Sequence, residues 1–387
     1  CFFMLTEHFH NTQKDTGHYS NDLRYVLSLQ NTIAAFEEIK TWEGYAKTPL
    51  HSLDSLASDI GVKNIYYKDE SSRFGLGSFK ALGGTYGVLK FIHHALKKEI
   101  GDEVSMKDIH AGKYSEQISK YTVTTATDGN HGRSVAFGAK LFGCKCQIYI
   151  HSEVSSGRQK AMEDLEATVN RISGNYDASL QICIEDAGKN NWHVISDTSY
   201  EGYTKYPRYI MAGYNVMAEE IIDQIKDRPL PTHVFLQGGV GSFPGAICGY
   251  FWERFPGNNI KFVVVESEHA PCLIRSAQNN QMTSVSIKQE TMMAGLSCGE
   301  PSLLGWEILK SGTDDFITIN DSSIPGLMRL LAKNNLKIEA GESSVAGLAG
   351  LIESMEDQKI ADAMELNKES IVLLFGTEGA TDPEIYS

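Results

Sequence analysis

The sequence SSRFGLGSFK, from Ser71 to Lys80, decides the fold because it joins an expected strand at residues 64–68 to an expected helix at residues 80–98. A lysine at the start of a helix lies at the positive end of the helix dipole, which disfavours its ammonium and makes the neutral amine accessible. Such an amine can form a Schiff base with a carbonyl compound. A phosphate-binding loop would need four residues between its first glycine and Gly-Lys, and a dinucleotide fingerprint would need glycine in place of Lys80. A reactive amine and an ordinary solvated lysine therefore both stay open for Lys80.

Short runs of β-branched and aromatic residues recur along the chain, each followed by a longer segment of helical period. This alternation predicts an α/β protein with parallel strands. The expected strands lie at residues 64–68, 121–127, 146–151, 192–196, 233–237, 261–266, 316–320 and 371–375. The expected helices lie at residues 80–98, 132–142, 157–167, 206–226, 244–255, 322–335 and 343–355. We expect a loop at residues 101–116 and a poorly ordered arm before Asn21.

Composition and charge exclude several classes of partner. The chain has 387 residues, 42% of them hydrophobic and 22% charged, which is long enough for two lobes. Its 35 Lys and Arg residues against 49 Asp and Glu residues give a net charge of −14, which would repel a nucleic-acid backbone. No apolar run reaches the roughly 20 residues of a membrane-spanning helix, and residues 1–5 lack the charged start of a signal peptide. We therefore expect a cytoplasmic protein without nucleic-acid or membrane partners.

The seven cysteines predict neither a disulfide framework nor a metal site, because their number is odd and no CxxC pair occurs among them. Most are expected to be small buried side chains. Cys272 and Cys298 lie in two loop-like segments, which leaves a bridge between these two open.

The sequence TDGNHG, from Thr127 to Gly132, ends one expected strand and begins a helix. The carboxyl ends of strands in open α/β sheets are where ligands bind. Asn130 is suited to hydrogen-bond a ring oxygen, and Asp128 to act as an acid or a base. A capping turn is the alternative, since Asp and Asn are favoured there. For His131 we favour a structural role over that of a general base.

The sequence QGGVGSFP, from Gln237 to Pro244, carries the strongest phosphate signal in the chain. It follows a strand and leads into a helix, so successive glycines let backbone N–H groups close around a phosphate at the helix start. The alternative is a dinucleotide site formed by Gly239 and Gly241, with Glu266 at the end of the next strand to bind a ribose. Pro244 stands where that fingerprint has its third glycine.

Taken together, residues 77–80, 128–132 and 238–242 resemble the cofactor lysine, substrate loop and phosphate cradle of the fold-type-II pyridoxal-phosphate (PLP) enzymes, the family of tryptophan synthase β. Further segments resemble the diaminopropionate ammonia-lyases: WEGYAKTPL at 42–50, DTSYEGY at 197–203, MAGLSCGEP at 293–301 and GTEGATDP at 376–383. The resemblance covers about residues 20–387. It implies two lobes, each with a mostly parallel sheet flanked by helices. Residues 1–83 and 197–387 would form a large PLP-binding lobe, and residues 84–196 a smaller inserted lobe.

The resemblance also implies which residues hold the cofactor. Lys80 would carry PLP as a Schiff base, with Phe79 beside the pyridine ring and Asn130 on the ring hydroxyl. The phosphate would be bound by Gly238, Gly239, Val240, Gly241 and Ser242. The ring nitrogen would face a neutral hydroxyl near the last strand, which points to Thr377. Gly376 departs from relatives that often carry serine there, so the partner of the ring nitrogen is open.

The activity implied by the resemblance is α,β-elimination of 2,3-diaminopropionate, as the D isomer, the L isomer or both, to pyruvate and two ammonia. Lys80 would remove the Cα proton on one face, and Asp128 would be the base on the other. Asp197 would bind the β-ammonium or manage its proton, with a cap before Thr198 as the alternative. A serine or threonine dehydratase on the same fold is the nearest rival, and a nucleotide-dependent oxidoreductase is a more distant one. A homodimer is expected from family analogy.

Overall fold

The computed structural model describes residues 5–15, 17–127, 129–333 and 337–381. These residues form two compact units. Unit 1 comprises the described residues of 1–79, 198–202 and 214–380, and unit 2 comprises those of 80–197, 203–213 and 381–387. The chain therefore passes from one unit to the other at the peptide bond between Phe79 and Lys80.

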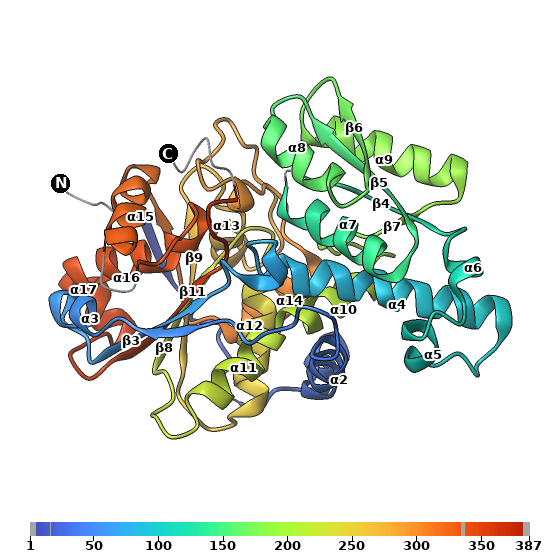
Figure 1. Ribbon diagram of the computed structural model, residues 1–387. Helices are drawn as coiled ribbons and strands as arrows, with labels where there is room; N and C mark the ends of the chain where they lie inside the picture. The colour runs from blue at the N-terminus through green and yellow to red at the C-terminus, as the bar shows by residue number, and fades with distance from the viewer. Residues whose placement is uncertain (1–4, 16, 128, 334–336, 382–387) are drawn as a thin grey trace. The chain divides into compact units, whose positions relative to one another are not determined.

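Unit 1 is built on a seven-stranded sheet with the strand order β1-β10-β9-β8-β11-β3-β2 (Figure 1). Its strands are β1 (Glu7–His10), β2 (Leu50–Ser52), β3 (Asn64–Asp69), β8 (His233–Gln237), β9 (Lys261–Ser267), β10 (Asp315–Ile319) and β11 (Ile371–Gly376). The edge strands β1 and β2 pair antiparallel, and the five strands between them run parallel. Every residue of β8 and β11 is buried, as expected of central strands covered on both faces.

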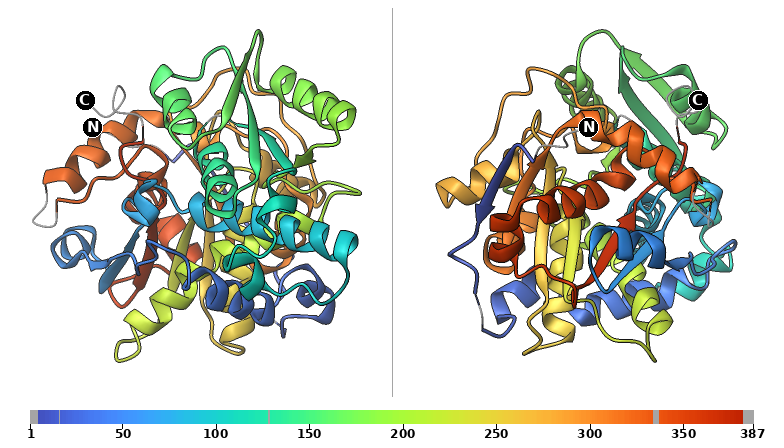
Figure 2. Two further views of the ribbon diagram at one scale, coloured as in Figure 1. Left: turned by 45° about the vertical axis from the view of Figure 1, so that its right-hand side comes forward. Right: turned by 90° about the vertical axis from the view of Figure 1, so that its left-hand side faces the viewer.

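Helices cover both faces of the sheet in unit 1 (Figure 2). They are α1 (Asn21–Val26), α2 (Leu29–Ile39), α3 (Asp54–Ile60), α11 (Val216–Gln224), α12 (Ser242–Arg254), α13 (Cys272–Asn279), α14 (Leu303–Gly312), α15 (Ile324–Lys333), α16 (Ala346–Glu356) and α17 (Gln358–Met364). α16 packs against β8, β9 and β10, while α12 contacts β8 and packs against α2, α11 and α14. Because β8, β11 and β3 are parallel neighbours, the segments that follow their carboxyl ends lie at the same edge of the sheet.

Unit 2 is built on a four-stranded parallel sheet with the order β6-β5-β4-β7. Its strands are β4 (Thr122–Ala126), β5 (Lys145–His151), β6 (Thr168–Ile172) and β7 (His193–Val194). Its helices are α4 (Lys80–Ile100), α5 (Met106–His110), α6 (Ser115–Ile118), α7 (Asn130–Phe142), α8 (Ser156–Glu163), α9 (Tyr176–Asn190) and α10 (Lys205–Tyr214). A Cβ added at Gly84 would lie 2.4 Å from Ser134 Oγ, so α4 and α7 approach closely because position 84 carries no side chain.

The predicted α/β class with mostly parallel strands is confirmed, but three local predictions are wrong. Glu7–His10 form the edge strand β1 within the expected arm, and Met106–His110 form α5 within the expected loop at residues 101–116. The expected helix at 206–226 is two helices, α10 and α11. Asn215 lies at the break, where its side-chain amide donates to Thr32 Oγ1 at 3.0 Å. Tertiary contacts of this kind leave no periodic signal in the sequence.

No helix in the described part of the chain is long and apolar enough to cross a membrane. The described cysteines Cys144, Cys146, Cys183, Cys248, Cys272 and Cys298 are free thiols, so the bridge left open between Cys272 and Cys298 is not formed in this structure. Cys1 lies outside the described residues.

Candidate active site

Lys80 and Asp197 form an ion pair within unit 2, with 2.6 Å between Lys80 Nζ and Asp197 Oδ2. Lys80 begins α4 and Asp197 follows β7, so the fold joins positions 117 residues apart. Burial alone would raise the pKa of Asp197, but the neighbouring His131 and Lys80 hold it well below its ordinary value. An ionised carboxylate at this distance favours the ammonium form of the Lys80 amine, which opposes the effect expected from the helix dipole.

His131 lies on the other side of Asp197. Its Nε2 is 2.8 Å from the carbonyl oxygen of Ile195, which can only accept, so Nε2 carries a proton. The buried Nδ1 lies 3.7 Å from Asp197 Oδ2 and has no hydrogen-bond partner among the described residues. Burial lowers the pKa of His131, against the raising effect of Asp197. The contact with Ile195 fits the structural role expected for this residue, while the approach of Nδ1 to Asp197 was not predicted.

The main chain just before Asp197 is held by Tyr203. The Tyr203 hydroxyl donates to the carbonyl oxygen of Val194 at 2.9 Å and accepts from the backbone N–H of Ser196 at 3.0 Å. Sequence reasoning missed this role, although Tyr203 ends the segment DTSYEGY that starts at Asp197. The tyrosine fixes the direction in which the chain leaves β7.

Thr127 caps the start of α7. Thr127 Oγ1 accepts hydrogen bonds from the backbone N–H groups of Gly129 at 3.0 Å and Gly132 at 3.1 Å. A capping role was the alternative considered for Asp128 and Asn130, and the structure shows that Thr127 caps this helix. Asn130 is the first residue of α7 and is partly exposed within unit 2. Asp128 lies outside the described residues.

In unit 1, the residues Gly238–Ser242 form a buried turn between β8 and α12. The backbone N–H of Gly238 donates to the carbonyl oxygen of Val265 at 2.8 Å. Gly239 and Gly241 have φ angles of 59° and 95°, a left-handed conformation that favours glycine. The first N–H groups of a helix have no partner within the helix, and the start of α12 is suited to bind an anion.

Glu266 lies directly behind this turn. Its Cγ would be 2.6 Å from a Cβ added at Gly238, so only glycine fits there. The two carboxylate oxygens accept hydrogen bonds from the backbone N–H groups of Leu273 and Ile274, each at 2.8 Å, at the start of α13. Burial raises the pKa of Glu266 to about 8 against those bonds. A buried carboxyl group bound in this way does not fit the ribose-binding role of the dinucleotide alternative.

Thr377 directly follows β11, which is the neighbour of β8 in the sheet. Its side chain is buried, and among the described residues its Oγ1 has no hydrogen-bond partner. Its carbonyl oxygen accepts from the backbone N–H of Phe79 at 3.0 Å. The Phe79 ring is buried between Tyr214 and Phe243, with ring centroids 4.7 and 4.9 Å away.

No cluster of three or more His, Cys, Asp or Glu side chains suited to hold a metal ion occurs among the residues that the structure describes. The two groups of candidate residues therefore offer an amine, carboxylate and imidazole in unit 2. In unit 1 they offer a helix start suited to bind an anion and a buried hydroxyl that no described residue bonds.

Residues 41–376 match the model of a family described as pyridoxal-phosphate dependent enzyme. The chain is 38% identical over 351 residues to the diaminopropionate ammonia-lyase of Escherichia coli, which covers 89% of this chain and 87% of that protein. The chain belongs to the PLP-dependent enzymes, in the diaminopropionate ammonia-lyase family. The corresponding protein of Salmonella typhimurium is 37% identical over 375 residues, or 93% of each chain.

The architecture agrees with this membership of the PLP-dependent enzymes. A crystal structure of diaminopropionate ammonia-lyase from Escherichia coli, in complex with an aminoacrylate-PLP azomethine reaction intermediate, has a TM-score of 0.88 and 34% identity. The match covers 100% of this chain and 97% of that one. The predicted fold type II is thereby confirmed, and PLP is the cofactor of the chain.

The described residues of unit 1 fit PLP by two independent observations. The turn at 238–242 has glycines 239 and 241 in the left-handed conformation and leads into α12, whose first N–H groups are suited to bind a phosphate. The Thr377 hydroxyl is buried and has no hydrogen-bond partner in the described part of the chain, as expected of a group whose partner is an atom of the cofactor. The chemistry of these residues therefore suits a phosphorylated pyridine.

The absence of serine at position 376 has a packing reason. A Cβ added at Gly376 would lie 2.5 Å from Cε1 and Oη of Tyr67, whose ring is fully buried. The ring of Tyr67 thus occupies the space that a side chain at 376 would need. A hydroxyl at this edge of the sheet is supplied by Thr377 instead.

We expect Gly376→Ser to lower the free energy of unfolding by about 1–3 kcal/mol, because it overpacks the site beside Tyr67. Urea unfolding of the cofactor-free protein measures this effect. Gly326→Ser is the matched control, since a Cβ at Gly326 meets nothing within 4 Å. Equal midpoints for Gly376→Ser and Gly326→Ser would contradict the assignment of Tyr67 as the obstacle.

Proposed function

We propose that this chain is a carbon–nitrogen lyase that converts 2,3-diaminopropionate and water into pyruvate and two molecules of ammonia. The identity of 37–38% to diaminopropionate ammonia-lyases over most of the chain supports this proposal. The observation that carries it is the contact between Lys80 and Asp197 in unit 2. A substrate with a second amine needs a carboxylate close to the catalytic base, and Asp197 meets that need.

Lys80 is proposed as the residue that attaches the cofactor and then removes the Cα proton from one face of the substrate. PLP, when bound, supplies an electron sink that makes this proton acidic. An enantiomer presents its proton on the opposite face and requires a second base there. Asp128 is the proposed second base, so the enzyme would accept both isomers.

Asp197 is proposed to bind the β-ammonium of the substrate. Its carboxylate is ionised, and once the Lys80 amine is engaged by the cofactor it needs another cation as partner. The β-ammonium of diaminopropionate is such a cation, whereas the hydroxyl of serine is neutral. Holding the amine in its protonated form lets it depart as neutral ammonia.

The remaining assignments concern cofactor binding. Asn130 is proposed to bind the ring hydroxyl, and Thr377 to donate to or accept from the ring nitrogen. Phe79 is proposed to lie beside the ring. The phosphate is proposed to bind to Gly238, Gly239, Val240, Gly241 and Ser242, for which the left-handed glycines and the start of α12 are the support.

We also propose the lobe boundaries, assembly and location expected from the sequence: a large lobe of residues 1–83 and 197–387, a small lobe of residues 84–196, and a homodimer in the cytoplasm. Light scattering coupled to gel filtration tests the assembly. A mass equal to that of one chain would refute the homodimer.

The deciding experiment measures ammonia and pyruvate release from D- and L-diaminopropionate and from D- and L-serine. We expect a higher kcat/KM for diaminopropionate than for serine. D-serine is the main competitor, because a structure of the Escherichia coli enzyme contains it. Faster turnover of serine would replace the proposal with the dehydratase alternative. Equal loss of both diaminopropionate isomers in Asp128→Asn would refute the assignment of Asp128.

A further inference from the structure

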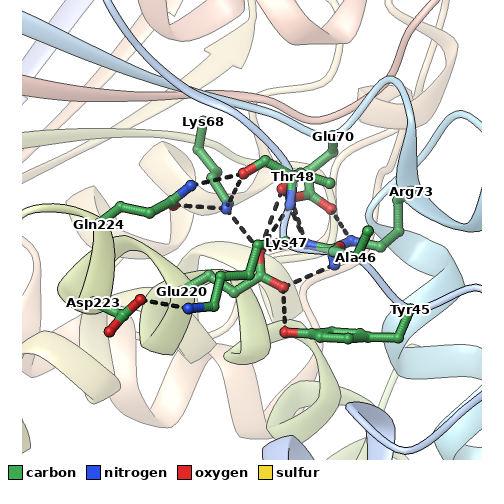
Figure 3. A network of polar contacts seen from close by, with 10 residues as sticks. All are labelled: Tyr45, Ala46, Lys47, Thr48, Lys68, Glu70, Arg73, Glu220, Asp223 and Gln224. Atoms are coloured by element: carbon green, nitrogen blue, oxygen red, sulfur yellow. Dashed lines mark hydrogen bonds and ion pairs between the residues drawn. The ribbon is translucent and has the colours of Figure 1, made fainter.

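Unit 1 contains a buried ion cluster formed by Lys68, Glu70, Arg73 and Glu220 (Figure 3). Their side chains are at most 1% exposed, and the two cations balance the two anions. Lys68 lies on β3, Glu70 and Arg73 lie just beyond its end, and Glu220 projects from α11. The cluster therefore connects the carboxyl end of the inner strand β3 to α11, a helix that is distant in sequence.

Arg73 is the centre of the cluster, because all five of its N–H groups are used. Its Nε and one NH2 hydrogen donate to the two oxygens of Glu70 at 2.8 and 2.9 Å. Its two terminal nitrogens also reach the oxygens of Glu220 at 2.9 and 2.8 Å. The carbonyl oxygen of Ala46 and the hydroxyl of Thr48 accept further bonds, each at 3.0 Å. Only a planar guanidinium can bind two carboxylates in this way.

Lys68 completes the charge balance around Glu220. Its Nζ donates to Glu220 Oε2 at 2.7 Å and to the carbonyl oxygen of Thr48 at 2.9 Å. Burial would raise the pKa of Glu220, but Arg73 and Lys68 lower it to about 2. Glu220 is thus ionised, and neither carboxylate can lose its partner without leaving an unpaired buried charge.

The cluster holds the start of the segment that leads into Lys80. Phe74, the residue after Arg73, has a φ of 50°, which is unfavourable for a side chain of this size. Such a conformation persists only where surrounding contacts impose it. The far end of the segment is fixed to the residues after β11, since Phe79 N–H donates to the Thr377 carbonyl and Gly379 N–H donates to that of Gly77. Residues 70–79 are therefore fixed at both ends.

We propose that Arg73 is a positioning residue: through the buried ion cluster it sets the path of residues 70–79, and thereby places Phe79 and Thr377 for the cofactor. This inference rests on the proposed roles of Phe79 and Thr377. Stability alone does not account for such a cluster, because well-packed apolar side chains stabilise a core equally well. What the charges add is a fixed geometry, with six directed hydrogen bonds from the five N–H groups of one side chain.

Arg73→Lys tests the proposal because it keeps the charge and loses the two-carboxylate geometry. We expect the cofactor-free variant to bind PLP at least about tenfold more weakly than wild type, as for the loss of a charge-assisted hydrogen bond. The visible circular dichroism of the bound cofactor should change as well. Lys47→Ala is the matched control, since it breaks the exposed pair between Lys47 and Asp223 beside the cluster (Figure 3). Its PLP affinity should equal that of wild type.

An unchanged PLP affinity in the folded fraction of Arg73→Lys would overturn the proposal, whatever its melting temperature, because the cluster would then serve stability only. If Arg73→Lys does not fold, the PLP affinity of Thr48→Val is measured instead, and an unchanged affinity would again overturn the proposal. This nearly isosteric change removes the hydroxyl that bonds Arg73, Glu70 and Glu220. PLP affinity is measured without substrate, so a wild-type chain that binds PLP but releases no ammonia refutes the proposed function alone.

Discussion

Lys80→Ala should bind PLP without a covalent link and lose turnover of diaminopropionate by at least about 10²–10⁴-fold, the contribution of a positioned general base. The physical reason is that one amine is proposed both to attach the cofactor and to remove the Cα proton. Borohydride reduction followed by peptide mass mapping measures the link. In wild type the reduced adduct should lie on the peptide that contains Lys80.

Two controls separate this role from the charge of Lys80. Lys80→Arg keeps a cation beside Asp197 but cannot form the link, so it should be as inactive as Lys80→Ala. Lys97→Ala removes a lysine from the exposed end of the same helix and should retain both the adduct and the activity. An adduct on any other lysine of wild type would contradict the assignment, and so would full activity in Lys80→Arg.

The parts of the fold that were predictable are those whose signal is local. The strand at 233–237 and the strand at 371–376 were expected within one residue, because a buried central strand is a short apolar run between polar residues. β1 was not predicted. Three of the four residues Glu7–His10 are polar, and they form a strand because β10 offers a free edge to pair with. Likewise, nothing local marks Asn215 as a break between α10 and α11.

The candidate site likewise contains features with a local sequence signal and features that depend on contacts between distant residues. The lysine segment at 71–80 and the glycine turn at 238–242 could be predicted because the residues that define each of them are adjacent in the sequence. The contact of Lys80 with Asp197 joins positions far apart, so sequence could propose each residue but not their pairing. Arg73 was quoted only as part of the lysine segment, since its partner Glu220 lies on another helix. The reason for Gly376 is equally non-local, because Tyr67 belongs to the neighbouring strand.

Asp197→Asn should lower kcat/KM for diaminopropionate by about 10²–10³-fold, corresponding to about 3–4 kcal/mol for loss of a desolvated charge partner. The amide keeps the size of the side chain and removes its charge. Turnover of serine should fall less, because its hydroxyl does not require an anion. Asp186→Asn is the control in the same unit, where the carboxylate accepts from the Tyr149 hydroxyl away from Lys80.

The pH dependence of activity provides a second test of the role of Asp197. With Lys80 in its ammonium form, His131 and Lys80 hold the pKa of Asp197 well below its ordinary value, and the β-ammonium of the substrate is proposed to take the place of the Lys80 cation during turnover. The carboxylate should therefore stay charged as the pH falls through the range in which an ordinary aspartate is protonated. The acid limb of wild-type activity should therefore come from another group, and Asp197→Asn should lower the whole profile without moving that limb. A shifted limb would assign the titration to Asp197 and contradict its role as a permanently charged partner. An equal loss of kcat/KM for diaminopropionate and for serine would show that the carboxylate does not bind the second amine of the substrate.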